Sequence, residues 1–257
     1  MKSGLLILVC SSAFAGEIPA SWISAIHDGA SAVTGIDVER FRASGSPGAA
    51  LVDIPFDAHL AIRYVMRIGT NLYLLKVAGD PFALAPRGRR FVEEGREVAE
   101  VGDGQFLIRA SRDTAILGSL HDAHWAAELM QCCPKHNLEI ATLVASFDAW
   151  IYQPREAEIP SADLLFEASR FAPPIHNLRA GVRFGNSVQI RVEVQTDNAL
   201  QASALAIAAK LTPTIIRNAG RIEADFAASI EKFSATARDN AVIAEMAVGA
   251  SALRLLE

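Results

Sequence analysis

The sequence has few cysteines and no excess of positive charge. Only three cysteines occur in 257 residues, and two of them, Cys132 and Cys133, are adjacent. The Cα atoms of adjacent residues lie about 3.8 Å apart, whereas a disulfide prefers about 5.5 Å, so we expect no disulfide scaffold. The net charge is −5 and the pI about 5.7. This balance argues against nucleic acid or an anionic membrane surface as a partner.

The sequence also lacks the short motifs that mark common catalytic and cofactor sites. It contains no G-x-S-x-G nucleophile elbow, no G-x-x-x-x-G-K-[ST] phosphate loop, no H-E-x-x-H and no C-x-x-C. Gly102-Asp103-Gly104 lacks the third glycine of a dinucleotide loop and is expected in a hairpin turn. Catalysis needs a nucleophile, or an acid and a base, within hydrogen-bond reach. We therefore expect a non-enzymatic protein that binds no cofactor.

Long hydrophobic runs are absent too, since no apolar run approaches the roughly 20 residues that span a bilayer. A short run does occur at the start, where Lys2 precedes Leu5–Val9 and the small-residue step Ala13-Phe14-Ala15 follows. A cation, a short apolar stretch and Ala-x-Ala predict a secretory signal peptide that is cut after Ala15. The mature protein is then expected in the periplasm or outside the cell.

What the sequence does contain is the two-residue alternation of β-hairpins. Residues 178–195 alternate apolar and polar side chains around Gly185-Asn186-Ser187, which predicts a half-buried hairpin. Thr196 or Asp197 is then a suitable N-cap for a helix to about Lys210. The apolar side of this predicted helix carries Leu200, Ala204, Ile207 and Leu211.

The hairpin pattern also occurs earlier in the chain. Residues 62–72 align without a gap on residues 178–188, at a constant offset of 116 residues. Residues 106–116 resemble residues 233–242, at an offset of 127 at the phenylalanines and 126 at the Arg-Asp pairs. Two matches in the same order favour a duplicated unit.

These patterns predict an α+β fold made of two tandem related units of antiparallel sheet with helices on one face, ferredoxin-like in spirit. We place the signal peptide at 1–15, the first unit at 16–140 and the second at 141–257. The boundary lies near Pro134–Leu143, where a Cys-Cys-Pro-Lys-His-Asn run interrupts the pattern. The predicted helices cover residues 120–131, 160–171, 197–211, 214–231 and 249–256.

One predicted helix carries side chains that are able to bind a metal. His121, His124 and Glu128 fall within a sector of roughly 60° at helical spacing. Two imidazoles and a carboxylate on one stripe suit zinc, with a fourth position left open. The competing interpretation is that this stripe is the solvated face of an amphipathic helix, with Trp125 and Leu129 on the other side. The sequence leaves both interpretations open.

Two clusters of charge have structural explanations. Arg112-Asp113 and Arg238-Asp239 recur at matching places, but an aspartate is favoured in a turn between strands because its side chain bonds the backbone. The basic segment 87–90 is followed by Glu93, Glu94, Glu97 and Glu100. Helical i,i+4 pairing of these opposite charges is the expected outcome.

The segment Arg112-Asp113-Thr114-Ala115-Ile116-Leu117-Gly118, with the helix expected after it, resembles an ending found in uncharacterised secreted bacterial proteins. The second copy departs from it after Val242. Such proteins have no activity to carry over to this chain. The sequence therefore predicts an exported, non-enzymatic protein that binds an unknown protein or cell-envelope component through uncovered sheet surface or edges. The alternative is a metal-binding protein or metal-dependent hydrolase built on His121, His124 and Glu128.

Overall fold

The computed structural model describes residues 20–26, 30–44, 60–66, 71–132, 137–154, 175–185, 187–211, 214 and 230–249. The predicted signal peptide and the predicted helix over 160–171 lie outside these residues. So do nearly all of the predicted helices over 214–231 and 249–256, although the structure places Ile230 at the start of a strand and Gly249 at the end of one.

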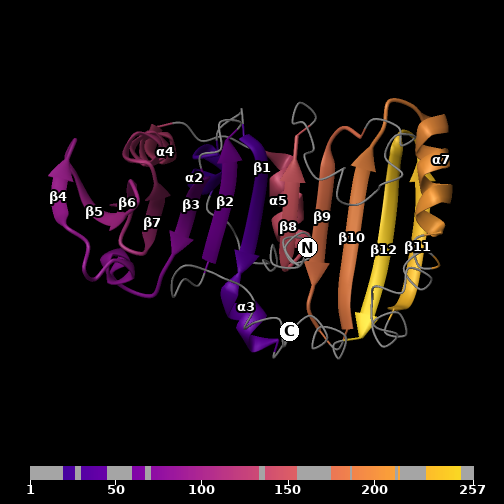
Figure 1. The fold of residues 1–257 in the computed structure, drawn as a ribbon, viewed down its shortest axis with the longest axis horizontal. Helices are drawn as coiled ribbons and strands as arrows, with labels where there is room; N and C mark the ends of the chain where they lie inside the picture. Colours follow the sequence, from indigo (N-terminus) through magenta and orange to yellow (C-terminus); the bar gives the residue numbers. More distant parts are fainter. Residues whose placement is uncertain are drawn as a thin grey trace.

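The described residues form one antiparallel sheet of 12 strands with a few helices (Figure 1). The strands of the first half are β1 (Ala30–Asp37), β2 (Leu60–Met66), β3 (Asn71–Lys76), β4 (Arg90–Glu93), β5 (Arg96–Gly102), β6 (Gln105–Arg109) and β7 (Thr114–Gly118). Those of the second half are β8 (Ala149–Gln153), β9 (Leu178–Arg183), β10 (Ser187–Gln195), β11 (Ile230–Arg238) and β12 (Ala241–Gly249). The helices are α2 (Ala20–Ser24), α3 (Val38–Ala43), the 3₁₀ turn η2 (Pro81–Leu84), α4 (Leu120–Cys132), α5 (Leu138–Ser146) and α7 (Ala199–Lys210).

The strand order confirms the predicted α+β class with two units of antiparallel sheet. The order is β11-β12-β10-β9-β8-β1-β2-β3-β7-β6-β5-β4, so the two units meet at the antiparallel pair β1 and β8. Outward from this pair, β2-β3-β7-β6 on one side matches β9-β10-β12-β11 on the other. Between β3 and β6, the first unit contains η2, β4 and β5. At the matching point of the second unit, between β10 and β11, the structure places α7.

The register at the centre corrects the sequence alignment at an offset of 116 residues, which equates Val33 with Ala149. In the structure Val33 pairs with Tyr152, and directly paired residues share one face of a sheet. Ala149 is three positions from Tyr152 and therefore lies on the opposite face. A two-fold rotation that relates antiparallel neighbours keeps each residue on its own face. If the two units are copies related by such a rotation, the sequence numbers of equivalent residues in β1 and β8 differ by an odd number, and an offset of 116 residues does not fit this register.

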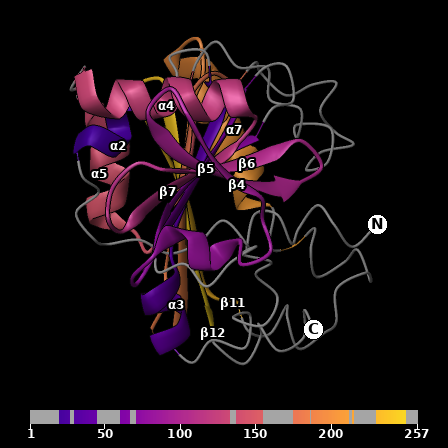
Figure 2. The ribbon, with the colours of Figure 1, turned by 90° about the vertical axis from the view of Figure 1, so that its left-hand side faces the viewer.

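The helices occupy both faces of the sheet. Helices α2, α4 and α5 gather on one face, where α2 packs on α4 (Figure 2). Helix α7 lies on the other face, where its Ala202 and Ala206 pack with Val194 and Val242. Val194 is adjacent to Glu193, which faces the α5 side, and neighbours in a strand point to opposite faces. No helix in the described part of the chain is long and apolar enough to cross a membrane.

Polar side chains cap the N-termini of three helices. Asn137 accepts hydrogen bonds from the backbone N–H groups of Glu139 and Ile140 and so caps α5. This cap lies three residues before the predicted end of the first unit at residue 140. Ser119 accepts from the N–H of Asp122 at the start of α4. For α7 the N-cap is Asn198, which accepts from the N–H of Gln201. The expectation that Thr196 or Asp197 caps this helix is therefore wrong by one or two residues.

Two further expectations are corrected by the fold. The charged segment around Glu93 and Glu97 forms the β4–β5 hairpin rather than a helix, because the positive-φ pair Glu94-Gly95 supplies a two-residue turn. Gly102-Asp103-Gly104 lies in the β5–β6 turn, as predicted. Cys132 is disulfide-bonded, which the argument from adjacent cysteines did not anticipate.

Most of the core lies between the sheet and its helices in the first unit and at the centre. Its largest fully buried side chains include Trp22 of α2, Leu74 of β3, Ile108 of β6 and Trp150 of β8. Ile140 and Leu143 of α5 belong to the same cluster. A smaller, separate cluster holds α7 to β10 and β12. Among the described residues, fewer helices therefore pack on the α5 side of the second unit than on the same side of the first.

Candidate functional site

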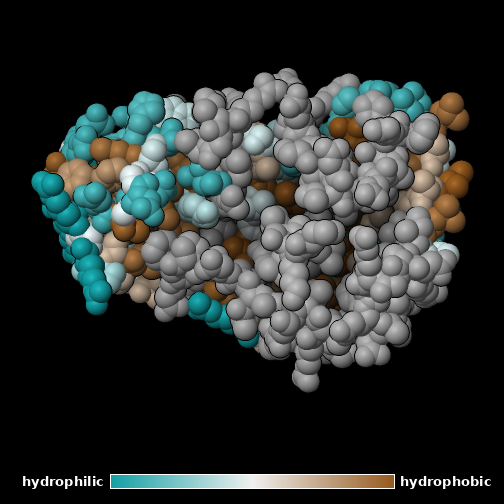
Figure 3. Space-filling model, viewed as in Figure 1, coloured by the Kyte–Doolittle hydropathy of each residue, from teal (hydrophilic) through white to brown (hydrophobic). Residues whose placement is uncertain are grey.

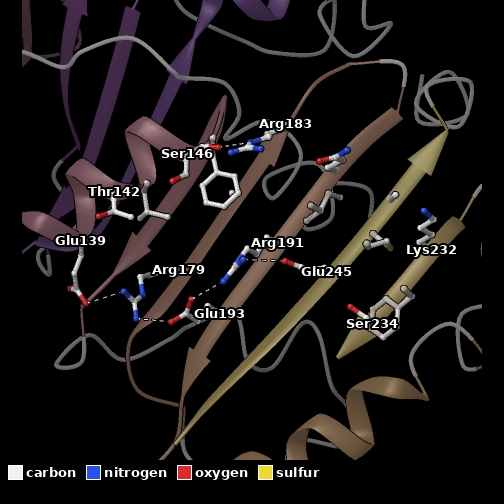
Figure 4. A pocket seen from close by; sticks show the side chains of 18 residues that line it. Glu139, Thr142, Ser146, Arg179, Arg183, Arg191, Glu193, Lys232, Ser234 and Glu245 are labelled. Atoms are coloured by element: carbon white, nitrogen blue, oxygen red, sulfur yellow. Dashed lines mark hydrogen bonds and ion pairs between the residues drawn. The ribbon is translucent and has the colours of Figure 1, made fainter. Parts of the chain in front are cut away.

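A groove lies on the α5 side of the second unit, over β9, β10, β12 and β11 (Figure 4). Its volume is about 920 Å³, and α5 forms one wall. The strand registers arrange the floor in rows that cross the sheet. One row pairs Gly181 with Arg191, Arg191 with Glu245, and Glu245 with Ser234. The flanking row toward Ser146 contains Arg183, Gln189, Ala247 and Lys232.

The wall of the groove depends on one glycine. The ring of Phe147, which follows the C-terminus of α5, lies directly over Gly181 of β9, and a Cβ at Gly181 would come within 2.1 Å of that ring. Only glycine leaves room for this contact. The contact fixes the distance between the end of α5 and the sheet, and so the width of the groove.

A chain of alternating charges crosses one end of the groove (Figure 4). Arg179 lies 3.4 Å from Glu139 of α5 and 2.7 Å from Glu193 of β10. Arg191 lies 3.8 Å from Glu193 and 3.1 Å from Glu245 of β12. These side chains are partly exposed, so the pairs add little to stability. Their effect is to fix the direction of each guanidinium and carboxylate along the floor.

Glu139, the first acid of this chain, is held by two further donors. The hydroxyl of Tyr152 donates to Glu139 at 2.5 Å, and the side-chain amide of Asn177 donates at 3.1 Å. Burial, and then the neighbouring Glu139, raise the pKa of the Tyr152 hydroxyl well above its usual range. Tyr152 therefore stays neutral and remains a donor. The position of α5 over β8 and β9 is fixed by these bonds as well as by Phe147.

The other end of the groove is cationic. Arg183 donates its Nε hydrogen to the backbone oxygen of Ser146 at 2.5 Å, and its guanidinium lies 5.7 Å from the centre of the Phe147 ring. Neither Arg183 nor Lys232 forms an ion pair within the described part of the chain. The groove thus has a balanced end, where each arginine has a carboxylate partner, and an end with two cations that have none.

The first unit presents a different surface on the same face. There the residues that point toward α4 are Leu72, Leu74, Ile108, Ile116 and Val98, all buried and apolar. An apolar sheet face must be covered, and α4 packs on β6 and β7 to cover it. In the second unit the corresponding strands carry Gln189, Arg191, Glu193, Glu245 and Lys232. A charged face has no such need, and among the described helices only α5 borders it.

Comparison with known proteins supports the fold only. No protein-family model matches the chain, and no curated protein matches it. The chain is similar to a solved structure described as "Structure of crystal form I of TP0453", with a TM-score of 0.55 and 12% sequence identity. The match covers 91% of this chain and 94% of that one. At this identity the likeness shows a shared fold and carries no function across.

The three predicted metal ligands do not come together. His121 and Glu128 are exposed on α4, whereas His124 is buried against the sheet. The Nδ1 atom of His124 lies 3.3 Å from a carboxylate oxygen of Glu94, in the β4–β5 turn. Among the described residues, no group of three or more histidine, cysteine, aspartate or glutamate side chains is placed to hold a metal ion. The interpretation as one solvated stripe also fails for His124, because small alanines on either side let α4 sit close to the sheet.

The two Arg-Asp pairs lie in turns, as the sequence analysis favoured. Asp113 accepts from the hydroxyl of Ser111 at 3.0 Å and lies in the β6–β7 turn. Asp239 has φ +52° in the two-residue turn between β11 and β12. Both pairs lie outside the groove lining.

Sequence reasoning missed the groove residues although their pattern is visible. Arg179, Gly181 and Arg183 alternate along β9, and Gln189, Arg191 and Glu193 alternate along β10. These are the polar positions of the predicted hairpin, which we assigned to solvent. The signal was that one hairpin face carries three arginines and a glycine. The partners on α5 and β12 are distant in sequence, so only the fold shows that the charges form a chain.

Proposed function

We propose that this chain is an exported, non-enzymatic binding protein, and that a polar component of the cell envelope occupies the groove between α5 and strands β9–β12. The observation that carries the proposal is the charged face of the second unit, on which α5 is the only helix among the described residues. The corresponding face of the first unit is apolar and lies beneath α4. Polar floors with fixed donors and acceptors orient a ligand, and concave sites of this size suit small molecules or short segments.

The chemistry of the lining supports binding rather than catalysis. Among the described residues, the side chains that line the groove include neither histidine nor cysteine. Its carboxylates are engaged by guanidinium groups, as at Arg179–Glu193 and Arg191–Glu245. Charged pairs of this kind select ligands by complementarity more than they add affinity. Export is supported by the leader pattern up to Ala15, and a mature chain that begins at Gly16 is the expected product of secretion.

The test is a ligand screen followed by amide NMR. We expect at least one compound from a panel of anionic, zwitterionic and cationic small molecules and tripeptides to shift the amides of Gly181, Gln189 and Arg191 in a saturable way. An Arg191→Ala, Glu245→Ala double variant is expected to weaken that binding, whereas Arg112→Ala, in the β6–β7 turn, is the matched control. Hits that map only to other surfaces, or that bind the double variant equally well, would contradict the proposal.

A further inference from the structure

We propose that the cationic end of the groove is an anion subsite, in which Arg183 and Lys232 together bind a carboxylate or phosphate group of the ligand. This inference rests on the proposed function, because it names the part of the ligand that the groove recognises. The observations that carry it are the register of the row, the missing acidic partners and the way Arg183 is held.

The register places both cations over one row of the floor. Arg183 pairs with Gln189, Gln189 with Ala247, and Ala247 with Lys232. Paired residues share a face, so all these side chains point into the groove. Three strand spacings of about 4.8 Å separate the ends of the row by about 14 Å. Arg183 is held toward Ser146 at one end of this gap, whereas the exposed Lys232 at the other end is able to reach inward. An anion that both side chains contact therefore lies above Gln189 and Ala247, with Lys232 extended toward it.

The small and neutral residues in the middle of the row leave space for that anion. Ala247 carries only a methyl group, and the Gln189 amide supplies N–H donors. The nearest acid on the floor is Glu245, which already pairs with Arg191 at 3.1 Å in the adjacent row. An anion in this row therefore meets two cations and an amide, and its only acidic neighbour is already compensated.

Arg183 is held in place before any ligand binds. Its Nε donates to Ser146, and its guanidinium stacks over Phe147. The two Nη groups remain as a planar pair of donors, the geometry that carboxylate and phosphate accept through two hydrogen bonds. Fixing the arginine in advance lowers the entropy lost on binding. Lys232 is exposed and adds a mobile point charge from the opposite side of the row (Figure 4).

The experiment titrates the full chain with inorganic phosphate, and separately with acetate, while amide and side-chain NMR shifts are followed. Saturable shifts are expected at Gln189, Ala247 and Lys232, with phosphate binding more tightly than acetate. Arg183→Gln and Lys232→Gln are each expected to raise the Kd for phosphate about tenfold, the effect of losing one charge-assisted hydrogen bond. Raising the salt concentration is expected to weaken binding, because partly exposed charges are screened.

Arg112→Gln and Lys210→Gln are the matched controls, since both side chains lie outside the groove lining, and they should leave the Kd unchanged. Thermal unfolding of each variant confirms that it is folded. No saturable shift in the row, or the same Kd in both groove variants, overturns the anion subsite. If a neutral or cationic compound from the panel nevertheless binds the groove, the subsite fails and the proposed function stands. If phosphate binds in this row but no panel compound binds in the groove, the anion subsite stands and the proposed function fails.

Discussion

At the scale of single residues, two close contacts place an aromatic ring against a glycine, one between the end of α5 and the sheet and one between the central strands β1 and β8. Gly181 lies under Phe147, and Gly35 of β1 lies under Trp150, where an added Cβ would be 2.5 Å from the indole. Glycine in a strand interior often marks a close approach of this kind. In this protein the two contacts set how near α5 and β8 come to their neighbours.

We expect Gly181→Ala to lower the free energy of unfolding by about 1–3 kcal/mol, because the new methyl group forces Phe147 out of position in a packed site. Urea denaturation followed by circular dichroism measures this. Gly185→Ala is the control, since its nearest neighbour is 3.8 Å away and the change also restricts the unfolded chain. An unchanged free energy of unfolding in Gly181→Ala would show that α5 is free to shift over the sheet.

Because of Tyr152, we expect the stability of the protein to decline at alkaline pH. Its pKa is raised by burial and then by Glu139, so the folded state keeps the hydroxyl proton at pH values where the unfolded chain loses it. The stability that this supplies is complete below the unfolded pKa of about 10 and declines as pH rises through the folded value. Tyr152→Phe is expected to lessen the loss of stability above about pH 10, measured as the change in urea midpoint with pH. An identical pH slope in the variant would show that the hydroxyl is not shielded.

At the scale of elements, helix α7 buries a different side from the one that its amphipathic pattern predicts. The sequence predicts that Leu200, Ile207 and Leu211 face the core, yet they are 81%, 64% and 56% exposed. Ala202 and Ala206 are buried instead. The small residues allow the helix to lie flat against β11 and β12. The larger apolar side chains therefore form a patch at the end of the sheet, visible on the right of Figure 3.

Substitutions on the two sides of α7 should separate these interpretations. Leu200→Gln and Ile207→Gln are each expected to change the free energy of unfolding by no more than about 0.5 kcal/mol, because the side chains are already in solvent. Ala202→Gln, on the buried side, is expected to cost about 1–3 kcal/mol through overpacking. Thermal or urea unfolding distinguishes the two groups. If Leu200→Gln lowered the free energy of unfolding more than Ala202→Gln, the prediction that Leu200 faces the core would be correct after all.

At the scale of the whole molecule, the two units share their main core. Trp22 of the first unit and Trp150 of the second are each 1% exposed and belong to one cluster. Helix α5 begins at Leu138, so it crosses the predicted boundary at residue 140. The central pair β1 and β8 joins the units into one sheet. Tandem units built in this way are not expected to fold independently.

We therefore expect the unfolding transitions of the two halves to coincide. In a Trp150→Phe variant buried tryptophan fluorescence reports mainly on Trp22, and in a Trp22→Phe variant mainly on Trp150. Within each variant, the fluorescence midpoint in urea should equal the midpoint from far-ultraviolet circular dichroism, which is the mark of two-state behaviour. Separate midpoints would mean that each unit holds a core of its own.

The sequence by itself determined the local elements, because a strand, a turn or a helix is set by the period of apolar residues and by the residues at its ends. The hairpin at 178–195 and the helix at 120–131 follow from such patterns. The same local rules placed the Arg-Asp pairs in turns. They also suggested that the unit is repeated, which stays a prediction, whereas the order of the strands confirms an α+β fold of two units.

Only the tertiary structure decided which face each pattern buries and which distant charges meet. Burial depends on what packs above a surface. In α7 the alanines face the sheet in place of the larger apolar residues. In α4, His124 is buried although it shares a stripe with exposed residues. The groove depends on side chains separated by more than 50 positions, such as Arg191 and Glu245. Coulomb attraction between them requires proximity in space, and that proximity comes from the pairing of β10 with β12, which no local pattern encodes.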